Sequence, residues 1–159
     1  MALVVDASVG LKWVLPEHDS HLAQALAVGD ETLLVPDFWL GEATNVLWMQ
    51  VRRGILTPDE AWKGLALLRA QVEPTPTAGM DLHGLALEIG LAVNHSTYDT
   101  LYPAFAIAIA IAIAIATGAR GVVVSDAAFV KDMQRHPDRV LAAMLIPLDQ
   151  WASGSGVVP

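Results

Sequence analysis

The sequence contains no cysteine. This absence excludes a disulfide framework, a thiolate nucleophile and a zinc–thiolate centre. Any metal ion that the chain binds is therefore held by oxygen atoms or by imidazole rings.

Positive charge is also scarce, with 9 Lys and Arg against 17 Asp and Glu and a formal net charge of −8. Nucleic-acid affinity normally comes from basic side chains that displace counterions, so this balance argues against long-range attraction to a polyanion. An acidic metal site would itself supply several of the negative charges, and bound cations would cancel part of them. The basic residues cluster at two places, a pattern more typical of solvated helix surface than of a binding patch: Arg52-Arg53, and Arg120, Lys131, Arg135 and Arg139.

A secretion leader is not evident, because Met1 to Val5 runs directly into Asp6 without a basic segment. The apolar run from Leu101 to Ala116 is shorter than the ~20 residues that a membrane-spanning helix needs. We therefore expect a cytoplasmic protein that does not insert into a membrane.

The length of 159 residues and the hydrophobic content of 54% fit one ordinary globular domain. We expect that domain to cover residues 1–150. Residues 151–159 are expected to form a flexible tail, because Ala152 to Gly156 is rich in serine and glycine.

Four short apolar runs separated by helical patterns predict strands at Leu3–Val5, Leu33–Val35, Gly121–Val124 and Met144–Ile146. Alternation of strands with helices indicates an α/β fold with a parallel sheet. Helices are expected from a cap at Asp37 to about Arg53, from a capping box at Thr57 and Glu60 to about Val72, over Met80–Ala92, and after a cap at Ser96.

The segment from Ala106 to Ala116 alternates alanine and isoleucine without interruption. Its period is that of a strand, but its neighbours favour a helix, and low-complexity expansion without function is a third interpretation. As a helix it would be apolar all round and would need burial on every side or a partner. We favour a buried or dimer-facing helix.

Acidic residues directly follow two of the predicted strands, Asp6 after the first and Asp126 after the third. Ligands of open α/β sheets bind beyond the carboxyl ends of the strands, so both acids are candidates for a functional site. Glu42 shares a helix face with Asn45, although an ordinary amphipathic helix would show the same pattern. Asp99 lies in the first turn of its helix, where favourable interaction with the helix dipole is an equally good explanation.

Carboxylates gathered in a cleft are suitable ligands for Mg²⁺ or Mn²⁺, which prefer hard oxygen atoms. Such a site hydrolyses phosphodiesters by activating a bound water and neutralising charge on the phosphate. No nucleophilic side chain is required.

Four motifs in order resemble those of PIN-domain proteins, especially the VapC-type toxins, over nearly the whole chain. They are Val4-Val5-Asp6-Ala7-Ser8 with Lys12-Trp13, Pro36-Asp37 with Glu42-Ala43-Thr44-Asn45-Val46-Leu47, Tyr98-Asp99-Thr100-Leu101-Tyr102, and Val123-Val124-Ser125-Asp126-Ala127-Ala128-Phe129. The resemblance implies a three-layer α/β/α fold with a central, mainly parallel sheet flanked by helices.

In that family the four acids line a pocket that binds magnesium or manganese. The resemblance implies that Asp6 and Asp99 are direct ligands and that Glu42 and Asp126 complete the site directly or through water.

The resemblance also implies supporting roles for three polar residues. Ser8 and Ser125 would hold the acids, with simple turn or cap chemistry as the rival explanation. Asn45 would orient Glu42 or touch the substrate, or it is an unrelated surface amide.

These features predict a metal-dependent endoribonuclease, by resemblance the toxin of a toxin–antitoxin pair. Its expected partners are an RNA substrate, a cognate antitoxin and a second copy of itself in a homodimer. The residues alone do not distinguish RNA from DNA. The alternative is a catalytically silent PIN-like module for protein binding, whose metal site the repeat has distorted.

Two departures from the family pattern lie between Asp99 and Asp126. The segment is longer than the resemblance suggests, with the excess in the alanine–isoleucine repeat, and Pro103 removes a backbone hydrogen bond where a helix would continue. His95 lies four residues before Asp99, where proton transfer or phosphate contact is an open alternative to a structural role. The tryptophans are expected to pack in the core or at an interface, with base stacking as the alternative.

Overall fold

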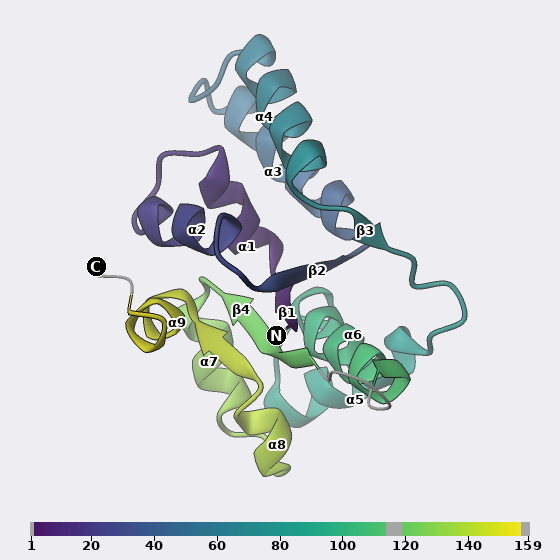
Figure 1. Ribbon diagram of the computed structural model, residues 1–159. Coiled ribbons are helices and arrows are strands. Elements are labelled where there is room, and N and C mark those ends of the chain that lie inside the picture. The colour runs from purple at the N-terminus through teal and green to yellow at the C-terminus, as the bar shows by residue number, and fades with distance from the viewer. Residues whose placement is uncertain (1, 114–118, 157–159) are drawn as a thin grey trace.

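A parallel sheet lies at the centre of the computed structural model, which describes residues 2–113 and 119–156 (Figure 1). Over that part of the chain, one five-stranded sheet forms in the order β3-β2-β1-β4-β5, with every neighbouring pair parallel. The strands are β1 (Ala2–Val5), β2 (Thr32–Pro36), β3 (Pro74–Thr75), β4 (Ala119–Val124) and β5 (Leu145–Pro147). All four predicted strands are confirmed, and β3 adds a short fifth.

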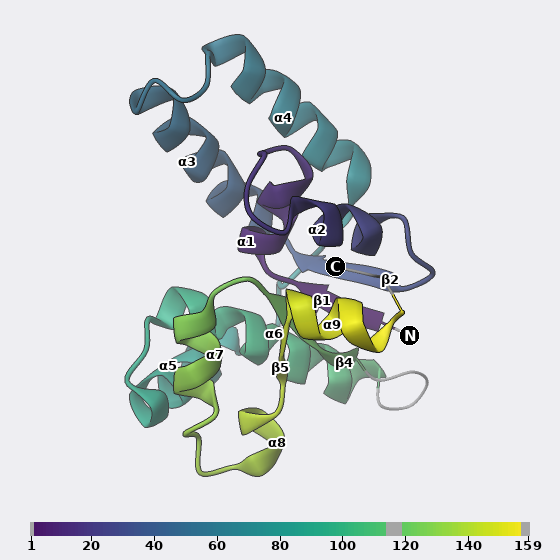
Figure 2. The same cartoon turned by 90° about the vertical axis from the view of Figure 1, so that its left-hand side faces the viewer.

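Helices cover both faces of the sheet. Figures 1 and 2 both place α1 to α4 on one side and α5 to α8 on the other, with α3 and α4 forming a helical hairpin that projects from the sheet. This arrangement confirms the three-layer α/β/α fold. The helical segments are α1 (Ala7–Gly10), the 3-10 helix η1 (Leu11–Trp13), α2 (Ser20–Ala27), α3 (Trp39–Arg52), α4 (Pro58–Gln71), α5 (Leu82–Val93), α6 (Thr97–Ile113), α7 (Ala127–Met133), α8 (Arg139–Ala142) and α9 (Leu148–Gly154).

The middle strands β1 and β4 form the centre of the core. Leu3, Val4 and Val5 are fully buried because both faces of a doubly covered parallel sheet exclude water. Val5 pairs with Val123, so the two strands end at nearly the same level. The residues that follow them therefore meet at one edge of the sheet.

The hairpin of α3 and α4 begins differently from the prediction. The expected cap at Asp37 is wrong: the residue that caps α3 is Phe38, whose side chain makes no capping hydrogen bond. The Asp37 carboxylate instead accepts hydrogen bonds from the backbone N–H of Thr77 at 3.0 Å and from its hydroxyl at 2.8 Å. The acid is used to tie together the segments that follow β2 and β3.

The start of α4 is the predicted capping box. The Thr57 hydroxyl accepts from the backbone N–H of Glu60, and the Glu60 carboxylate accepts from the backbone N–H of Thr57 at 2.7 Å. Pro58 occupies the first turn, where its missing N–H removes no helical bond.

Helix α6 carries the alanine–isoleucine repeat, and the favoured helical interpretation is confirmed as far as Ile113. Its first turn is capped as expected, since the Ser96 hydroxyl accepts from the N–H of Tyr98 at 3.2 Å. Ala106 and Ile109 are buried, and the helix packs on α5 and β4. Residues 114–118, and with them the end of the repeat, lie outside the described residues.

Pro103 does not end α6, which runs on for ten residues beyond it to Ile113. The proline ring has no N–H to donate to the carbonyl of the residue four positions earlier, which is Asp99. The departure from the family pattern therefore changes the backbone next to one candidate site residue without breaking the helix.

Three of the five tryptophans, Trp13, Trp39 and Trp151, confirm the expected packing role, and two lie on the surface. Trp39 is fully buried, and Trp13 packs beside it with ring centroids 5.9 Å apart. Trp48 and Trp62 are 57% and 70% exposed on the α3–α4 hairpin.

A helix crosses the expected boundary at residue 150. Helix α9 runs from Leu148 to Gly154, and Trp151 and Ala152 are buried because the helix packs on β4, β5 and α2. Residues 157–159 of the expected tail lie outside the described residues. In the described part of the chain, no helix has the length and hydrophobicity needed to span a bilayer.

Candidate metal centre

Asp6 lies at the end of β1, where the strand turns into α1. Its backbone N–H donates to the carbonyl of Val123 at 3.1 Å, which extends the β1–β4 pairing by one residue. Its carboxylate caps α1 by accepting from the N–H of Ser8 at 2.8 Å. The strand-end position that the sequence predicted is confirmed.

Asp6 is buried, with only 7% of the residue exposed. Burial raises its pKa from 3.8 to about 7, hydrogen bonds from Ser8 oppose this rise, and the negative charges of Glu42 and Asp99 add to it. A carboxylate in such a place is costly to ionise unless a cation lies nearby.

Glu42 reaches the site from the first turn of α3. Its Oε2 accepts a 2.6 Å hydrogen bond from the hydroxyl of Tyr102, and the same hydroxyl accepts from the N–H of Ala7 at 3.3 Å. Burial raises the pKa of Glu42, the Tyr102 hydrogen bond lowers it, and the charge of Asp99 raises it. Tyr102 is fully buried, so this contact fixes Glu42 beside the backbone that follows Asp6.

Asp99 lies in the first turn of α6 and is partly exposed. Its Oδ2 lies 3.1 Å from Nε2 of His95. Burial is the largest influence and raises the pKa of Asp99, whereas the nearby His95 lowers it and the charge of Asp126 raises it.

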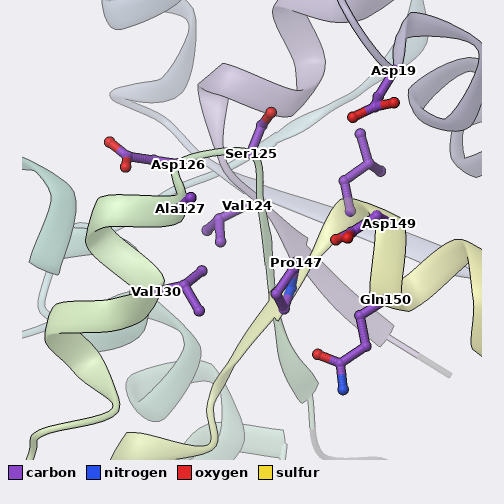
Figure 3. Close-up of a pocket in the computed structure, with 10 residues that line it drawn as sticks. Asp19, Val124, Ser125, Asp126, Ala127, Val130, Pro147, Asp149 and Gln150 are labelled. Carbon is purple, nitrogen blue, oxygen red and sulfur yellow. The ribbon is translucent and has the colours of Figure 1, made fainter.

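Asp126 follows β4 and caps α7. Its Oδ1 accepts from the N–H groups of Ala128 at 2.8 Å and Phe129 at 3.0 Å. A pocket of about 410 Å³ lies beside this turn. In Figure 3 the Asp126 carboxylate is directed away from Asp19 and Asp149, which lie on the other side of the pocket. The pocket itself is therefore not where the acids meet.

Mutual repulsion links the four acids. The charges of Glu42 and Asp99 raise the pKa of Asp6, the charge of Asp99 also raises that of Glu42, and the charge of Asp126 raises that of Asp99. The structure thus brings all four predicted site residues to the same edge of the sheet. Their separation in sequence, from residue 6 to residue 126, is bridged by the parallel arrangement of β1 and β4 and by the helices α3 and α6.

The four acids do not form a complete metal-coordination site in the positions that they occupy. Across residues 2–113 and 119–156, no three acidic or histidine side chains stand close enough together to hold one metal ion as they are. Each of the four is instead held by a neighbouring group: Asp6 by Ser8, Glu42 by Tyr102, Asp126 by the first turn of α7, and Asp99 by His95. The donor set fits a hard cation such as Mg²⁺, because it consists of carboxylates whose charges are only partly offset.

The three predicted supporting residues behave differently from one another. Ser8 contacts Asp6 through its backbone N–H, and its hydroxyl accepts from the N–H of Ser125 at 3.2 Å, so it joins the ends of β1 and β4. Ser125 contributes its backbone to that link. Asn45 is exposed on α3, and the hydrogen bond recorded for Glu42 goes to Tyr102.

The positively charged side chain of Lys12 is buried close to Ser8 and Asp126. Lys12 is 7% exposed, and its Nζ donates to the carbonyl of His18 at 2.6 Å and contacts Oε2 of Glu17 at 3.4 Å. It lines a pocket together with Ser8 and Asp126. The Lys12 ammonium group is thus already paired with the Glu17 carboxylate and the His18 carbonyl.

Two site contacts were not predicted from the sequence. The sequence pattern contains Tyr102 only as part of a motif, although its position three residues after Asp99 places both side chains on one helix face. The spacing of His95 from Asp99 predicts one of its contacts, but nothing in the sequence predicts its second partner, Asp132, whose Oδ2 lies 2.9 Å from Nδ1 of His95.

Comparison with known proteins supports the resemblance. No family model matches the chain. Ribonuclease VapC3 of Pyrobaculum aerophilum is 34% identical over an alignment of 113 residues, which covers 67% of this chain and 82% of that protein. The crystal structure of PAE2754 from the same organism covers 99% of this chain and 91% of its own with a TM-score of 0.58, and at 16% identity this likeness concerns the fold alone.

Proposed function

Because the chain belongs to the VapC family of PIN-domain ribonucleases, we propose that it is a metal-dependent endoribonuclease that hydrolyses RNA. The observation that carries the metal dependence is the burial of Asp6, which is only 7% exposed, close to Glu42 and Asp99, whose charges add to the rise in the pKa of its carboxyl. A divalent cation would remove that penalty, since it favours the ionised form of each carboxyl.

The proposed ligands are the four acids at the strand ends, as direct contacts or through water: Asp6, Glu42, Asp99 and Asp126. Magnesium or manganese held by these acids would activate a water molecule and neutralise charge on the phosphate. In the hydrolysis, the water oxygen bonds to phosphorus, one P–O bond to the sugar breaks, and the leaving oxygen takes a proton that the water gives up.

The chain's own groups keep the carboxylates in place. Tyr102 holds Glu42 through its hydroxyl, and the N–H of Ser8 holds Asp6. Ser8 also links the two strand ends through Ser125. These contacts come from α1, α6 and the residue that follows β4, so the site depends on how these segments pack together.

The biological role proposed here is that of a toxin, with an antitoxin as its partner, acting in the cytoplasm as a homodimer. The relative's designation as ribonuclease VapC3 supports the ribonuclease and toxin assignments. It does not favour the alternative of a catalytically silent protein-binding module.

RNA cleavage by the purified protein tests the proposal. The wild-type chain should cleave RNA when Mg²⁺ or Mn²⁺ is present and should stop when EDTA removes it. Asp6→Asn and Asp99→Asn should each abolish cleavage while the circular dichroism spectrum stays that of the folded protein. Asp59→Asn, an equivalent change of an exposed acid in the first turn of α4, is the control and should cleave normally. Metal-independent cleavage, or full activity of both site variants, would overturn the proposal.

A further inference from the structure

His95 lies between two carboxylates that come from different helices. Its Nε2 is 3.1 Å from Oδ2 of Asp99 on α6, and its Nδ1 is 2.9 Å from Oδ2 of Asp132 on α7. The ring stacks on Phe129 with centroids 4.7 Å apart and planes at 22°, and its side chain is only 14% exposed. Both the position and the plane of the imidazole are therefore fixed.

The contacts continue beyond the ring. The other oxygen of Asp132, Oδ1, accepts from Arg135, which follows the end of α7, at 2.9 Å. A chain of polar contacts thus runs from Arg135 through Asp132 and His95 to Asp99.

This series of polar contacts connects the two helices that hold neighbouring acids of the site. Asp99 is in the first turn of α6, and Asp126 caps the start of α7, the helix to which Phe129 and Asp132 belong. His95 therefore ties Asp99 to the helix that Asp126 begins, while the charges of these two acids repel each other.

We propose that His95 is a positioning residue that holds the Asp99 carboxylate, with Asp132 fixing the orientation of the ring. The inference rests on the proposed function, because it assigns His95 to the support of a metal ligand. Partners of this kind orient metal ligands in proteins, and their loss commonly lowers metal affinity by about 10- to 100-fold. The competing explanation is that His95 only packs α6 against α7.

Two amide substitutions separate these explanations. His95→Gln places an N–H donor near the position of Nε2 and keeps the contact with Asp99, whereas His95→Asn places one near Nδ1 and keeps only the contact with Asp132. Both variants lose the stacking on Phe129, so both lose a comparable part of the packing between the helices.

The test measures Mn²⁺ affinity by calorimetric titration in the absence of RNA, with thermal unfolding of the metal-free proteins as the measure of stability. His95→Asn should bind Mn²⁺ about 10-fold or more weakly than wild type, and His95→Gln should stay within about 3-fold. The same rank order is expected for cleavage activity. Restoration by glutamine, at equal metal-free stability, is a result that packing alone would not produce.

Equal Mn²⁺ affinities of the two variants would overturn this inference alone. A wild-type chain that binds no Mn²⁺ would overturn the proposed function and this inference with it. If His95→Asn does not fold, Asp132→Ala takes its place, since it removes the outer partner of the ring and leaves His95 present. Weaker Mn²⁺ binding by Asp132→Ala supports the positioning role, and unchanged binding contradicts it.

Discussion

The hydroxyl of Tyr102 donates a 2.6 Å hydrogen bond to Glu42, and this contact joins α6 to α3 at the edge of the sheet. Tyr102 is fully buried, and its ring meets Phe38, just before α3, edge-on with centroids 5.5 Å apart. Tyr102 therefore holds the start of α3 both by packing on Phe38 and by its hydrogen bond to Glu42. The geometry of Glu42 depends on a residue 60 positions away in sequence.

Replacing Tyr102 by phenylalanine removes the hydroxyl and keeps the ring. The metal-free protein should lose about 1.5–3 kcal/mol in its free energy of unfolding, because a partly buried carboxylate loses its donor. Chemical denaturation at pH 8 measures this loss. Tyr98→Phe is the matched control: Tyr98 is 80% exposed, so its change should stay within about 0.5 kcal/mol. Equal stability of the two variants would show that the hydrogen bond contributes nothing.

Gly10 allows α1 and α3 to approach closely. A Cβ at this position would lie 2.0 Å from Cζ2 of Trp39, which is fully buried three residues before Glu42. Gly10→Ala should therefore lower the free energy of unfolding by about 3 kcal/mol and displace the start of α3. Denaturation and Mn²⁺ binding measure the two effects.

Gly41 provides the control for that substitution, since a Cβ there meets nothing within 4 Å and the residue is exposed on α3. Gly41→Ala should raise the free energy of unfolding by up to about 1 kcal/mol, because alanine is the better helix former. A harmless Gly10→Ala would contradict the close approach of the two helices.

The pH dependence of stability in the metal-free protein follows from Asp6. Its pKa is raised from 3.8 to about 7 in the folded state, so the folded protein holds this proton more tightly than the unfolded chain. The resulting stabilisation is fully present below about pH 3.8 and is lost as the pH rises through 7. Glu42 and Asp99, whose pKa values are also raised, add in the same direction.

Asp6→Asn removes this loss of folding stability at high pH, because the amide has no proton to release. In EDTA, the variant should be about as stable as wild type near pH 4 and more stable at pH 8 by up to about 4 kcal/mol. Urea denaturation at the two pH values gives both differences. A stability difference that stays the same at both pH values would contradict the assigned cause.

The local features of the site could be predicted from the sequence. Asp6 and Asp126 each end a buried apolar run, and the end of a parallel strand is a position that a short sequence pattern reveals. The capping box of Thr57 and Glu60 was predictable for the same reason, since its hydrogen bonds stay within four residues.

The long-range contacts could not be predicted in this way. Some contacts form only when helices and strands that are far apart in the sequence pack together. They are the hydrogen bonds between Tyr102 and Glu42, between His95 and Asp132, and between Thr77 and Asp37. Asp37 shows the consequence for a local rule: an acid before a helix usually caps it, but here a tertiary partner competes successfully for the carboxylate. The serine- and glycine-rich end of the chain likewise looked flexible, whereas burial of Trp151 holds α9 in place.

Thermal unfolding with increasing Mn²⁺, in the absence of RNA, tests the central claim most directly. A ligand that binds only the folded state must raise the melting temperature, and at 100 times its dissociation constant it adds about 2.7 kcal/mol to the stability. Wild type and the control Asp59→Asn should show the same saturable rise, which Asp6→Asn should lose. A melting temperature of the wild-type chain that does not respond to Mn²⁺, or an equal rise in Asp6→Asn, would contradict the claim that these carboxylates form a metal centre.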